Sequence, residues 1–473
     1  MHKVMTFCSF KFTASYLLNA LIISSFFSMN AVASAHSQGE ENKQAYSQGR
    51  EISELPDVLS FKQRVEPINA MVVDRLDNLL PKLMREADLD MWLVINREYG
   101  EDRLFYTLVP QPTFAARRTT LLVFAKKDDG TVERFSVSRY PIGSVYPTVW
   151  DGGSKTEQWE RLAEVIIQRD PKRIGINISE DWALADGLSV GLHRQLLKYL
   201  PKKYQNRLVS AQDLVIRWME TRSEKELHVY PQVVTLARGV IAEAFSNKVI
   251  TPGVTSTDDI AWYIRERFEA LQLRPWFQPY VNIQRQGDVT SKDDDFMGQS
   301  GIIVQPGDVL HTDVGICYMN LCTDTQEMAY VLKMGEAEVP NGLVIAFKIG
   351  NQWQDILTSN FVTGRSGNEI LKNTINQSKA KGIHSSTYTH PLGFVGHASG
   401  PTIGMWDNQG PTPVQGDWKL YPNTAYAIEG NIATQLPEWN NQWVQIKLEQ
   451  SAVFDGENVW YLAGRQTKWH VIH

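Results

Sequence analysis

The spacing of apolar residues in the N-terminal half alternates between helical and strand-like patterns. Residues 72–87 repeat apolar positions at helical spacing, which predicts an amphipathic helix. Short, continuous apolar runs follow at residues 91–95, 119–124 and 173–176, and each predicts a buried strand. Helices that alternate with buried strands are typical of an α/β domain, and we expect one here.

Longer helical patterns follow in the middle of the chain. Ser223 and Glu226 have the spacing of a capping box, and the helix that they begin should run to about Asn247. Pro231 either bends this helix or marks a later start. A second helix should begin at residues 255–258, where Thr and Ser precede an acidic residue.

A domain boundary is expected near Glu220, where the alternating pattern ends. From residue 308 onward the pattern changes to strands separated by glycine-rich turns. We therefore expect domains at residues 52–219 and 220–473. Residues 36–51, which are rich in Ser, Gln, Glu and Asn, should form a flexible lead-in.

The first 35 residues have a different character. Lys3 and Lys11 precede an apolar run over residues 16–27, and small residues end the segment at Ala35. This order is typical of a secretory signal peptide, so we expect an exported protein, periplasmic or secreted, without membrane contact after cleavage. An uncleaved anchor is the alternative, although Asn19 and several serines interrupt a run that is short for a membrane span.

Composition narrows the class of protein. The chain has 473 residues, of which 21% are charged and 43% hydrophobic, so it is long enough for two or three folded domains. A net charge of −6 argues against a nucleic-acid partner, which needs a basic face. Three cysteines are too few for a disulfide-built scaffold.

Two aspartates mark the first candidate for chemistry. Residues 309–315 predict a strand that contains Asp313, and residues 321–324 should begin its antiparallel partner across a turn near Met319 and Asn320. Such a hairpin brings Asp313 and Asp324 to one point. Two buried carboxylates repel each other, and a bound divalent cation removes that cost. For either aspartate alone, a turn or surface role is the more common one.

Further candidates follow toward the C-terminus. His390 and His397 are seven residues apart in a segment interrupted by glycine. Glu429 and Glu449 each lie in an apolar strand pattern, and a buried acid needs a partner, which Lys447 could be for one of them. Each signal is weak alone, because an isolated histidine is more often a hydrogen-bonded structural residue.

In sequence order, Asp313, Asp324, His390, Glu429 and Glu449 resemble the ligands of the two-metal peptidase family that contains methionine aminopeptidase, Xaa-Pro aminopeptidase and prolidase. The resemblance covers about residues 222–465. Upstream, the chain is similar to the N-terminal domain of Xaa-Pro aminopeptidases, prolidases and creatinases. The resemblance implies an α/β N-terminal domain, an α+β pita-bread catalytic domain and a homodimer.

The resemblance also implies two divalent metal ions on the inner face of a curved sheet. Asp313 and Glu449 would bridge the ions, Asp324 would complete the shell of one ion, and His390 and Glu429 would bind the other. Four carboxylates and one imidazole form an oxygen-rich set that suits Mn²⁺, with Co²⁺ and Zn²⁺ as alternatives. A water activated by the ions would attack the amide carbonyl of a peptide or small amide substrate.

Two residues would then act directly in catalysis. Glu429 takes the place of the family's ligand glutamate that also handles the proton. His397 takes the place of a second histidine that steadies the substrate or the tetrahedral intermediate. We expect His397 to lie too far along its segment to share an ion with His390.

The chain departs from the family's pattern at residues that would surround the substrate. Phe296 stands where Xaa-Pro enzymes usually carry a histidine, Ala398 replaces a glutamate after His397, and Lys447 replaces an arginine. Unless His384 or Lys447 supplies a charge, we expect weak activity on simple Xaa-Pro dipeptides and better activity on an apolar or non-standard amide. The alternatives are a creatinase-like hydrolase or lyase acting on a small non-peptide substrate, and a non-catalytic binding protein.

Cys317 and Cys322 flank the turn of the predicted hairpin. They are either two buried free thiols or, in an exported protein, a disulfide.

Overall fold

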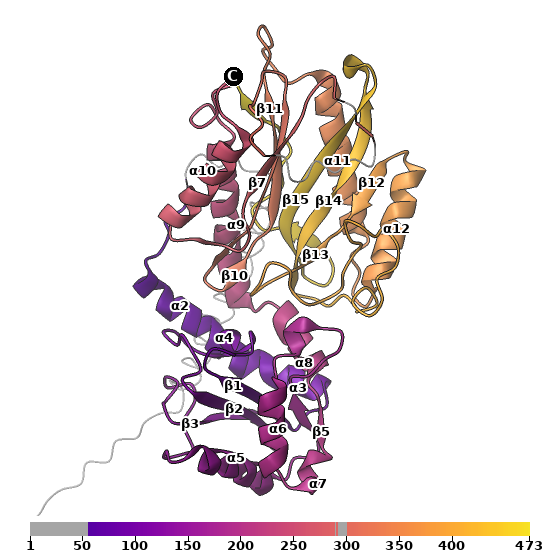
Figure 1. Cartoon of the computed structure of the whole chain (residues 1–473). Coiled ribbons are helices and arrows are strands. Elements are labelled where there is room, and N and C mark those ends of the chain that lie inside the picture. The colour runs from indigo at the N-terminus through magenta and orange to yellow at the C-terminus, as the bar shows by residue number, and fades with distance from the viewer. Residues whose placement is uncertain (1–54, 289, 292–299) are drawn as a thin grey trace, which may run out of the picture.

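The chain forms two domains, arranged one above the other in Figure 1. The structure, a computed structural model, describes residues 55–288, 290–291 and 300–473. The predicted signal peptide and lead-in, and Phe296, lie outside the described residues, so those predictions stay untested.

The N-terminal domain is a five-stranded sheet in the order β3-β2-β1-β4-β5, with helices packed around it. The β1–β4 and β4–β5 pairs are parallel, and the remaining pairs are antiparallel. Its strands are β1 (Met91–Arg97), β2 (Thr119–Lys126), β3 (Val132–Ser138), β4 (Ile174–Ile176) and β5 (Leu208–Ser210). Its helices are α2 (Phe61–Asp74), α3 (Leu80–Glu86), α4 (Phe105–Leu108), α5 (Lys155–Arg169), α6 (Val190–Tyr199), α7 (Lys202–Gln205) and α8 (Gln212–Glu220). The α/β class and the three predicted strands are confirmed.

The first helix begins earlier than its apolar spacing predicts. Ser60 and Gln63 form a capping box, so α2 starts at Phe61, and a π-helical turn η1 (Arg75–Leu79) joins it to α3. Side-chain caps set the start of a helix independently of its apolar face, which is why periodicity alone gave the wrong bound.

The C-terminal domain is a pita-bread fold built on a nine-stranded, curved sheet. Its central order is β12-β14-β15-β11-β8-β7, with β13 beside β14, β16 beside β15 and β17 beside β11. The strands of this sheet are β7 (Tyr280–Gln284), β8 (Val309–Val314), β11 (Thr325–Val331), β12 (His384–Thr387), β13 (His390–Leu392), β14 (Thr424–Leu436), β15 (Gln442–Phe454), β16 (Val459–Tyr461) and β17 (His470–Ile472).

Four long helices cover this sheet. They are α9 (Glu224–Ala244), α10 (Thr257–Ala270), α11 (Asn341–Ser359) and α12 (Gly367–Ala380). α9 and α10 pack against the half with β7, β8 and β11, whereas α11 and α12 pack against the half with β14, β15 and β12 (Figure 1). The predicted capping box of Ser223 and Glu226 is confirmed, and Pro231 lies inside a continuous α9.

The predicted hairpin needs one correction. The turn does lie at Met319 and Asn320, both with positive φ, but the strand directly after it, β10 (Leu321–Cys322), pairs with β9 (Ile316–Tyr318) and not with β8. The partner of β8 is β11, which starts after Asp324. A small three-stranded sheet, β10-β9-β6, therefore interrupts the hairpin, and β6 (Arg274–Pro275) completes it.

Cys317 and Cys322 face each other across the β9–β10 pair and form a disulfide, so the second of the two alternatives holds.

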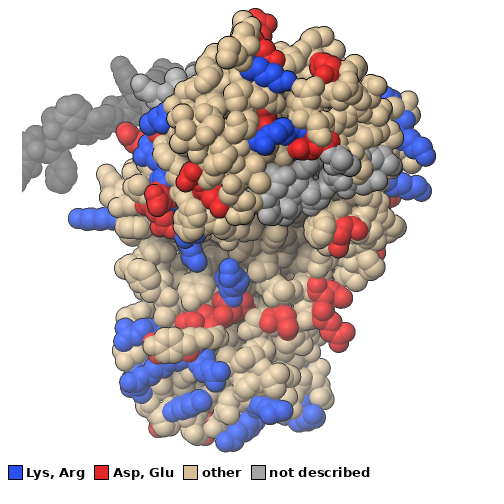
Figure 2. Space-filling view, turned by 45° about the horizontal axis from the view of Figure 1, so that its top comes forward, with Lys and Arg blue, Asp and Glu red and all other residues tan. Residues whose placement is uncertain are grey.

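One large hydrophobic cluster contains residues from both domains, among them Leu76, Trp218, Val233 and Leu310. On the face drawn in Figure 2, Lys and Arg are most frequent over the N-terminal domain and are mixed with Asp and Glu elsewhere. Among the helices of the described residues, none combines the length and apolar character that crossing a membrane requires.

Candidate metal centre

The strand pairing of the curved sheet sets three of the four predicted carboxylates in one row on its inner face, and Asp324 directly precedes β11. Asp313 on β8 is the Cα partner of Gln326 on β11, which is the partner of Glu449 on β15, which is the partner of Glu429 on β14. Because neighbouring strands lie about 4.8 Å apart, adjacent members of this row can contact one another. Side chains of alternate residues share a face, so this row is fixed by pairing and not by sequence distance.

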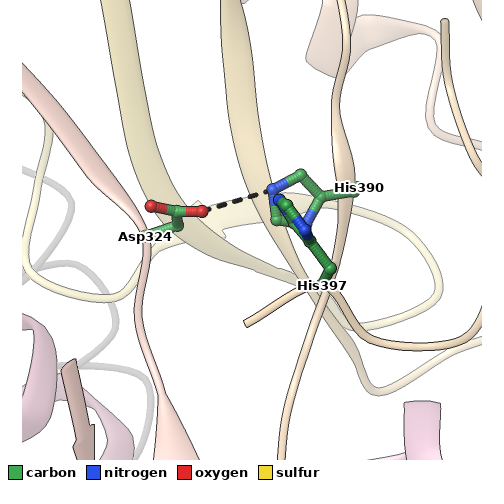
Figure 3. Close-up of side chains that lie close together, drawn as sticks. All are labelled: Asp324, His390 and His397. Carbon is green, nitrogen blue, oxygen red and sulfur yellow. Dashed lines mark ion pairs between the residues drawn. The ribbon is translucent and has the colours of Figure 1, made fainter. Parts of the chain in front are cut away.

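His390 brings an imidazole close to three of these carboxylates. Its Nε2 atom lies 3.4 Å from Oδ2 of Asp324, 3.6 Å from Oε2 of Glu429 and 3.9 Å from Oε1 of Glu449. Figure 3 shows the His390 and Asp324 side chains pointing toward each other. Two ligands that each bind one ion at about 2.1 Å with a tetrahedral angle lie about 3.4 Å apart, so these separations suit a shared ion.

The same side chains carry buried polar atoms that have no hydrogen-bond partner. They are Oδ1 of Asp313, Oδ1 of Asp324, both carboxylate oxygens of Glu449, and Nε2 of His390. An unpaired buried polar group costs about 1–3 kcal/mol, and more when it is charged. Five such atoms at one point, four oxygens and one imidazole nitrogen, fit a divalent cation, which would satisfy all of them.

Three groups of possible ligands each have their ligand atoms within 4.8 Å of one another. The groups are Asp313 with Asp324 and Glu449, His390 with Glu429 and Glu449, and Asp324 with His390 and His397. The first two together contain the five predicted ligands and share Glu449. The structure therefore brings together the whole set that the sequence predicted.

The comparisons with known proteins agree with this geometry. The family model described as "Metallopeptidase family M24" matches residues 231–454. The C-terminal domain of this chain belongs to metallopeptidase family M24. No curated protein matches the chain.

Solved structures share the two-domain fold of this M24 protein at low sequence identity. The X-Pro aminopeptidase from Thermotoga maritima MSB8 superposes with a TM-score of 0.59 at 16% identity, over 82% of this chain and 99% of that one. The Xaa-Pro dipeptidase from Bacillus anthracis superposes with a TM-score of 0.57 at 15% identity, over 85% of this chain and 100% of that one. The prolidase from Pyrococcus horikoshii OT3 superposes with a TM-score of 0.54 at 14% identity, over 85% of this chain and 99% of that one.

Burial and mutual repulsion hold protons on the M24 carboxylates when no cation is present. Burial raises the pKa of Asp324 to about 8. Burial, and then the charge of Asp324, raises the pKa of Asp313, Glu429 and Glu449 well above their usual values. Burial lowers the pKa of His390 to about 4, so its imidazole is neutral at pH 7 and can bind a cation.

A second layer of side chains orients the ligands, and the sequence did not single these residues out. The Tyr280 hydroxyl donates to Oδ2 of Asp313 at 2.9 Å. The amide nitrogen of Gln326 donates to Oε1 of Glu429, and Oε1 of Gln326 lies 2.8 Å from Nε2 of His311. Because burial and then the charge of Lys447 lower the pKa of His311 to about 3, this imidazole is neutral and donates its Nε2 proton to Gln326.

Strand parity could have identified part of this layer. Gln326 follows Asp324 by two residues and His311 precedes Asp313 by two, so each pair has the spacing of one sheet face. No such signal marks Tyr280, which is brought to Asp313 by the pairing of β7 with β8.

His397 lies closer to the candidate ligands than expected. Its ring makes an edge contact with His390, with 4.6 Å between ring centroids, and Figure 3 draws it beside that residue. The expectation that His397 lies too far away to share an ion with His390 is therefore wrong, because the segment folds back at Gly393 and Gly396. Burial and the neighbouring His390 lower the pKa of His397 to about 4.

The remaining predicted residues lie at different distances from this row. Lys447 is buried on the same face of β15 as Glu449 and acts electrostatically on Asp313 and His311. His384 is exposed on β12, where it pairs with Ala433 and its ring contacts Trp443. Ala433 lies four residues beyond Glu429 on β14, about 13 Å along the strand, so His384 is distant from the row.

Proposed function

We propose that the protein is a metal-dependent exopeptidase that hydrolyses the bond after the N-terminal residue of a peptide or dipeptide, with an Xaa-Pro preference. The observation that carries this proposal is a cluster of four carboxylates and one imidazole. Buried ligand atoms of Asp313, Asp324, Glu449 and His390 in this cluster have no hydrogen-bond partner among the described residues. The superposed structures are an X-Pro aminopeptidase, an Xaa-Pro dipeptidase and a prolidase, and at this low identity they support the fold alone.

We propose that Asp313, Asp324, His390, Glu429 and Glu449 hold two divalent ions, Mn²⁺ first among Mn²⁺, Co²⁺ and Zn²⁺, because hard oxygen ligands predominate. When bound, the ions would supply an activated water and polarise the amide carbonyl. Glu449 belongs both to the group with Asp313 and Asp324 and to the group with His390 and Glu429, so its carboxylate would help to hold both ions.

The chain's own side chains would handle the proton and the substrate. Gln326 donates to Oε1 of Glu429, which keeps Oε2 directed toward His390. Glu429 is therefore fixed in one orientation and can accept a proton from water and pass it to the leaving amine. His397, more exposed than His390 and next to it, is placed to donate a hydrogen bond to the oxygen of the tetrahedral intermediate.

Substrate selection should involve the next row of inner-face residues. Asn282 pairs with His311 on β8, His311 pairs with Met328 on β11, and Asn431 pairs with Lys447 on β15. Both polar side-chain atoms of Asn282 and Nδ1 of His311 are buried without a hydrogen-bond partner. A polar group of the substrate that lies beside the scissile bond could satisfy them.

A substrate panel tests the proposal. Protein loaded with Mn²⁺ would be assayed on an Xaa-Pro dipeptide, an Xaa-Pro tripeptide, the matched Xaa-Ala peptides and small non-peptide substrates such as the guanidino acid creatine, with Glu429→Gln as the inactive control. Hydrolysis of any peptide that is lost in the control supports the exopeptidase, and faster turnover of the Xaa-Pro members supports the preference. Activity on the non-peptide substrates alone would favour the creatinase-like alternative, and no hydrolysis at all would favour a binding protein.

The variant Phe296→His introduces the histidine that Xaa-Pro enzymes usually carry at this position, and so tests whether its absence limits the activity of this protein. If the missing imidazole limits the reaction, the variant should gain kcat/KM on Xaa-Pro dipeptides over the wild type. If the wild type is already fast on them and the variant gains nothing, the altered shell does not limit activity and ordinary prolidase chemistry stands.

We also propose that the protein is exported and forms a homodimer. The disulfide between Cys317 and Cys322 supports an oxidising compartment. Fractionation of cells that express the full chain, followed by mass analysis of the N-terminus and of the particle in solution, tests both proposals.

A further inference from the structure

Phe394 lies between His390 and His397 in the sequence, and its ring contacts two guanidinium groups. Cζ of Arg75 lies 4.8 Å from the ring centroid and Cζ of Arg222 lies 4.7 Å from it. Arg75 belongs to η1 in the N-terminal domain, and Arg222 belongs to the short link between α8 and α9. A desolvated contact between a cation and an aromatic ring is attractive, so this ring is held from its own domain through Arg222 and from the N-terminal domain through Arg75.

The two arginines are themselves fixed by one carboxylate. Glu226 accepts from Nη1 of Arg75 at 2.8 Å and from Nη1 of Arg222 at 3.2 Å. All three side chains are buried. Arg75 also donates to the backbone oxygens of Thr221 and Trp218. A buried ion pair between Glu226 and either arginine cannot separate without leaving a buried charge unpaired. The two guanidinium groups therefore form a rigid support for the ring.

The backbone on both sides of Phe394 is tightly enclosed. The oxygen of Gly393 accepts from the backbone nitrogen of Cys322 at 2.8 Å, and a Cβ atom at Gly393 would crowd Arg222. A Cβ atom at Gly396 would collide with the ring of Trp276. The backbone is therefore confined on both sides of Phe394, so a displacement of this ring would move the residues around it.

A displacement of the Phe394 ring would affect the position of His397 most. Its ring contacts Trp276, with centroids 5.0 Å apart, and His390, and both are edge contacts. The indole nitrogen of Trp276 donates to the oxygen of Thr323, beside Asp324. Two ring edges limit the place of the imidazole but make no hydrogen bond to it, so its place depends on the backbone that Phe394 anchors.

We propose that Phe394, held by Arg75 and Arg222, is a positioning residue that keeps the His397 imidazole beside Asp324 and His390. The N-terminal domain, through Arg75, thus contributes to the order of the catalytic segment. The activity part of this inference rests on the proposed function, whereas the placement of His397 does not.

The test compares two variants that each remove one contact between an arginine and an aromatic ring. Phe394→Leu removes the proposed anchor. Tyr421→Leu is the matched control, because Cζ of Arg217 lies 3.6 Å from the Tyr421 ring and the loop around Tyr421 carries none of the candidate ligands. Both variants would be examined for thermal stability, for kcat and KM with Mn²⁺, and by NMR of metal-free protein with ¹³C-labelled histidine, the His397 signal being assigned with His397→Gln.

We expect Phe394→Leu to lower kcat roughly 10–100-fold with KM within about twofold, as a small misplacement of a catalytic group does. Its His397 signal should show faster relaxation and a changed shift in the metal-free protein. Tyr421→Leu should leave the His397 signal and kcat unchanged, even where its loss of thermal stability is similar. Phe394→Tyr, which keeps the ring, should restore the wild-type signal.

An unchanged His397 signal in folded Phe394→Leu, or the same change in both leucine variants, would overturn the proposal. If Phe394→Leu does not fold, Arg75→Lys replaces it. That variant keeps the charge beside Glu226 but loses the planar group over the ring, and an unchanged His397 signal there overturns the proposal equally. A displaced His397 in a protein whose wild type hydrolyses no peptide would overturn the proposed function alone.

Discussion

Nε2 of His390 lies 3.4 Å from Oδ2 of Asp324, too far for a strong hydrogen bond, and each of the two residues belongs to one of the two ligand groups that share Glu449. The two residues come from opposite halves of the curved sheet, since Asp324 precedes β11 and His390 begins β13. A cation at this point would join the two halves, so metal binding should affect both the stability and the activity of the domain.

Metal content is the first prediction. We expect close to two Mn²⁺ ions per chain after refilling, because the two ligand groups that share Glu449 can each hold one ion. Asp313→Ala should lose at least one of them, since it removes one member of the first group. Elemental analysis of dialysed protein gives the stoichiometry, and Asp407→Ala, an exposed acid outside these groups, is the control. Trace binding that Asp313→Ala does not change would contradict the metal centre.

The second prediction concerns the pH dependence of stability without metal. The pKa of Asp324 is about 8 in the folded state against 3.8 in the unfolded chain, so the folded state binds more protons between these values. The free energy of unfolding of the metal-free protein should therefore fall as pH rises through this window. Below pH 6.5 the lowered pKa of His390 acts in the opposite direction, which leaves pH 6.5–8 as the clearest range.

Calorimetry from pH 6.5 to 8 in the presence of a chelator measures this loss. Addition of Mn²⁺ should raise the melting temperature more at pH 8 than at pH 6.5, because ions bind the ionised carboxylates. A metal-free melting temperature that rises over this range would show that the raised pKa values are wrong.

His397 is the subject of the third prediction. His397→Ala should lower kcat by roughly 10²–10³, the value of one donor that stabilises charge in the transition state, while Mn²⁺ affinity changes little. Because the structure places His397 within reach of Asp324 and His390, the affinity measurement is essential. A fall in affinity comparable with that of His390→Ala would make His397 a ligand, and unchanged kcat would make it structural.

The disulfide gives the fourth prediction. Cys317 and Cys322 close a short loop directly before Asp324. The double variant Cys317→Ser, Cys322→Ser should lower the free energy of unfolding by about 2 kcal/mol and weaken Mn²⁺ binding, because the hairpin before this ligand loses a constraint. Denaturant unfolding and calorimetric titration measure both effects. The wild-type protein provides the reference, and equal stability of the double variant and the wild type would contradict the prediction.

The sequence by itself singled out the candidate ligands and predicted much of the local structure. The caps at Ser223 and Ser256 act within one helical turn, so their residues are sufficient to place the starts of α9 and α10. Glu429 and Glu449 each lie in an apolar strand pattern, where a buried carboxylate needs a partner. Their order with His390 then made the resemblance to the two-metal peptidases specific.

Only the tertiary structure decided which residues surround those ligands. Tyr280 reaches Asp313 through the pairing of β7 with β8, which leaves no trace in sequence distance. Gln326 and His311 have the spacing of one sheet face with Asp324 and Asp313, but only the pairing of β8 with β11 shows that they join the row. The β9–β10 pair interrupts the predicted hairpin and draws Cys317 to Cys322.

The longest-range contact shows the same limit most clearly. Arg75 and Phe394 belong to different domains, and their sequence neighbours predict only a helix and a glycine-rich turn. Local patterns report the forces that act along a strand or helix. The place of the His397 imidazole, by contrast, depends on how two separately patterned domains pack against each other, and that packing was visible only in the folded chain.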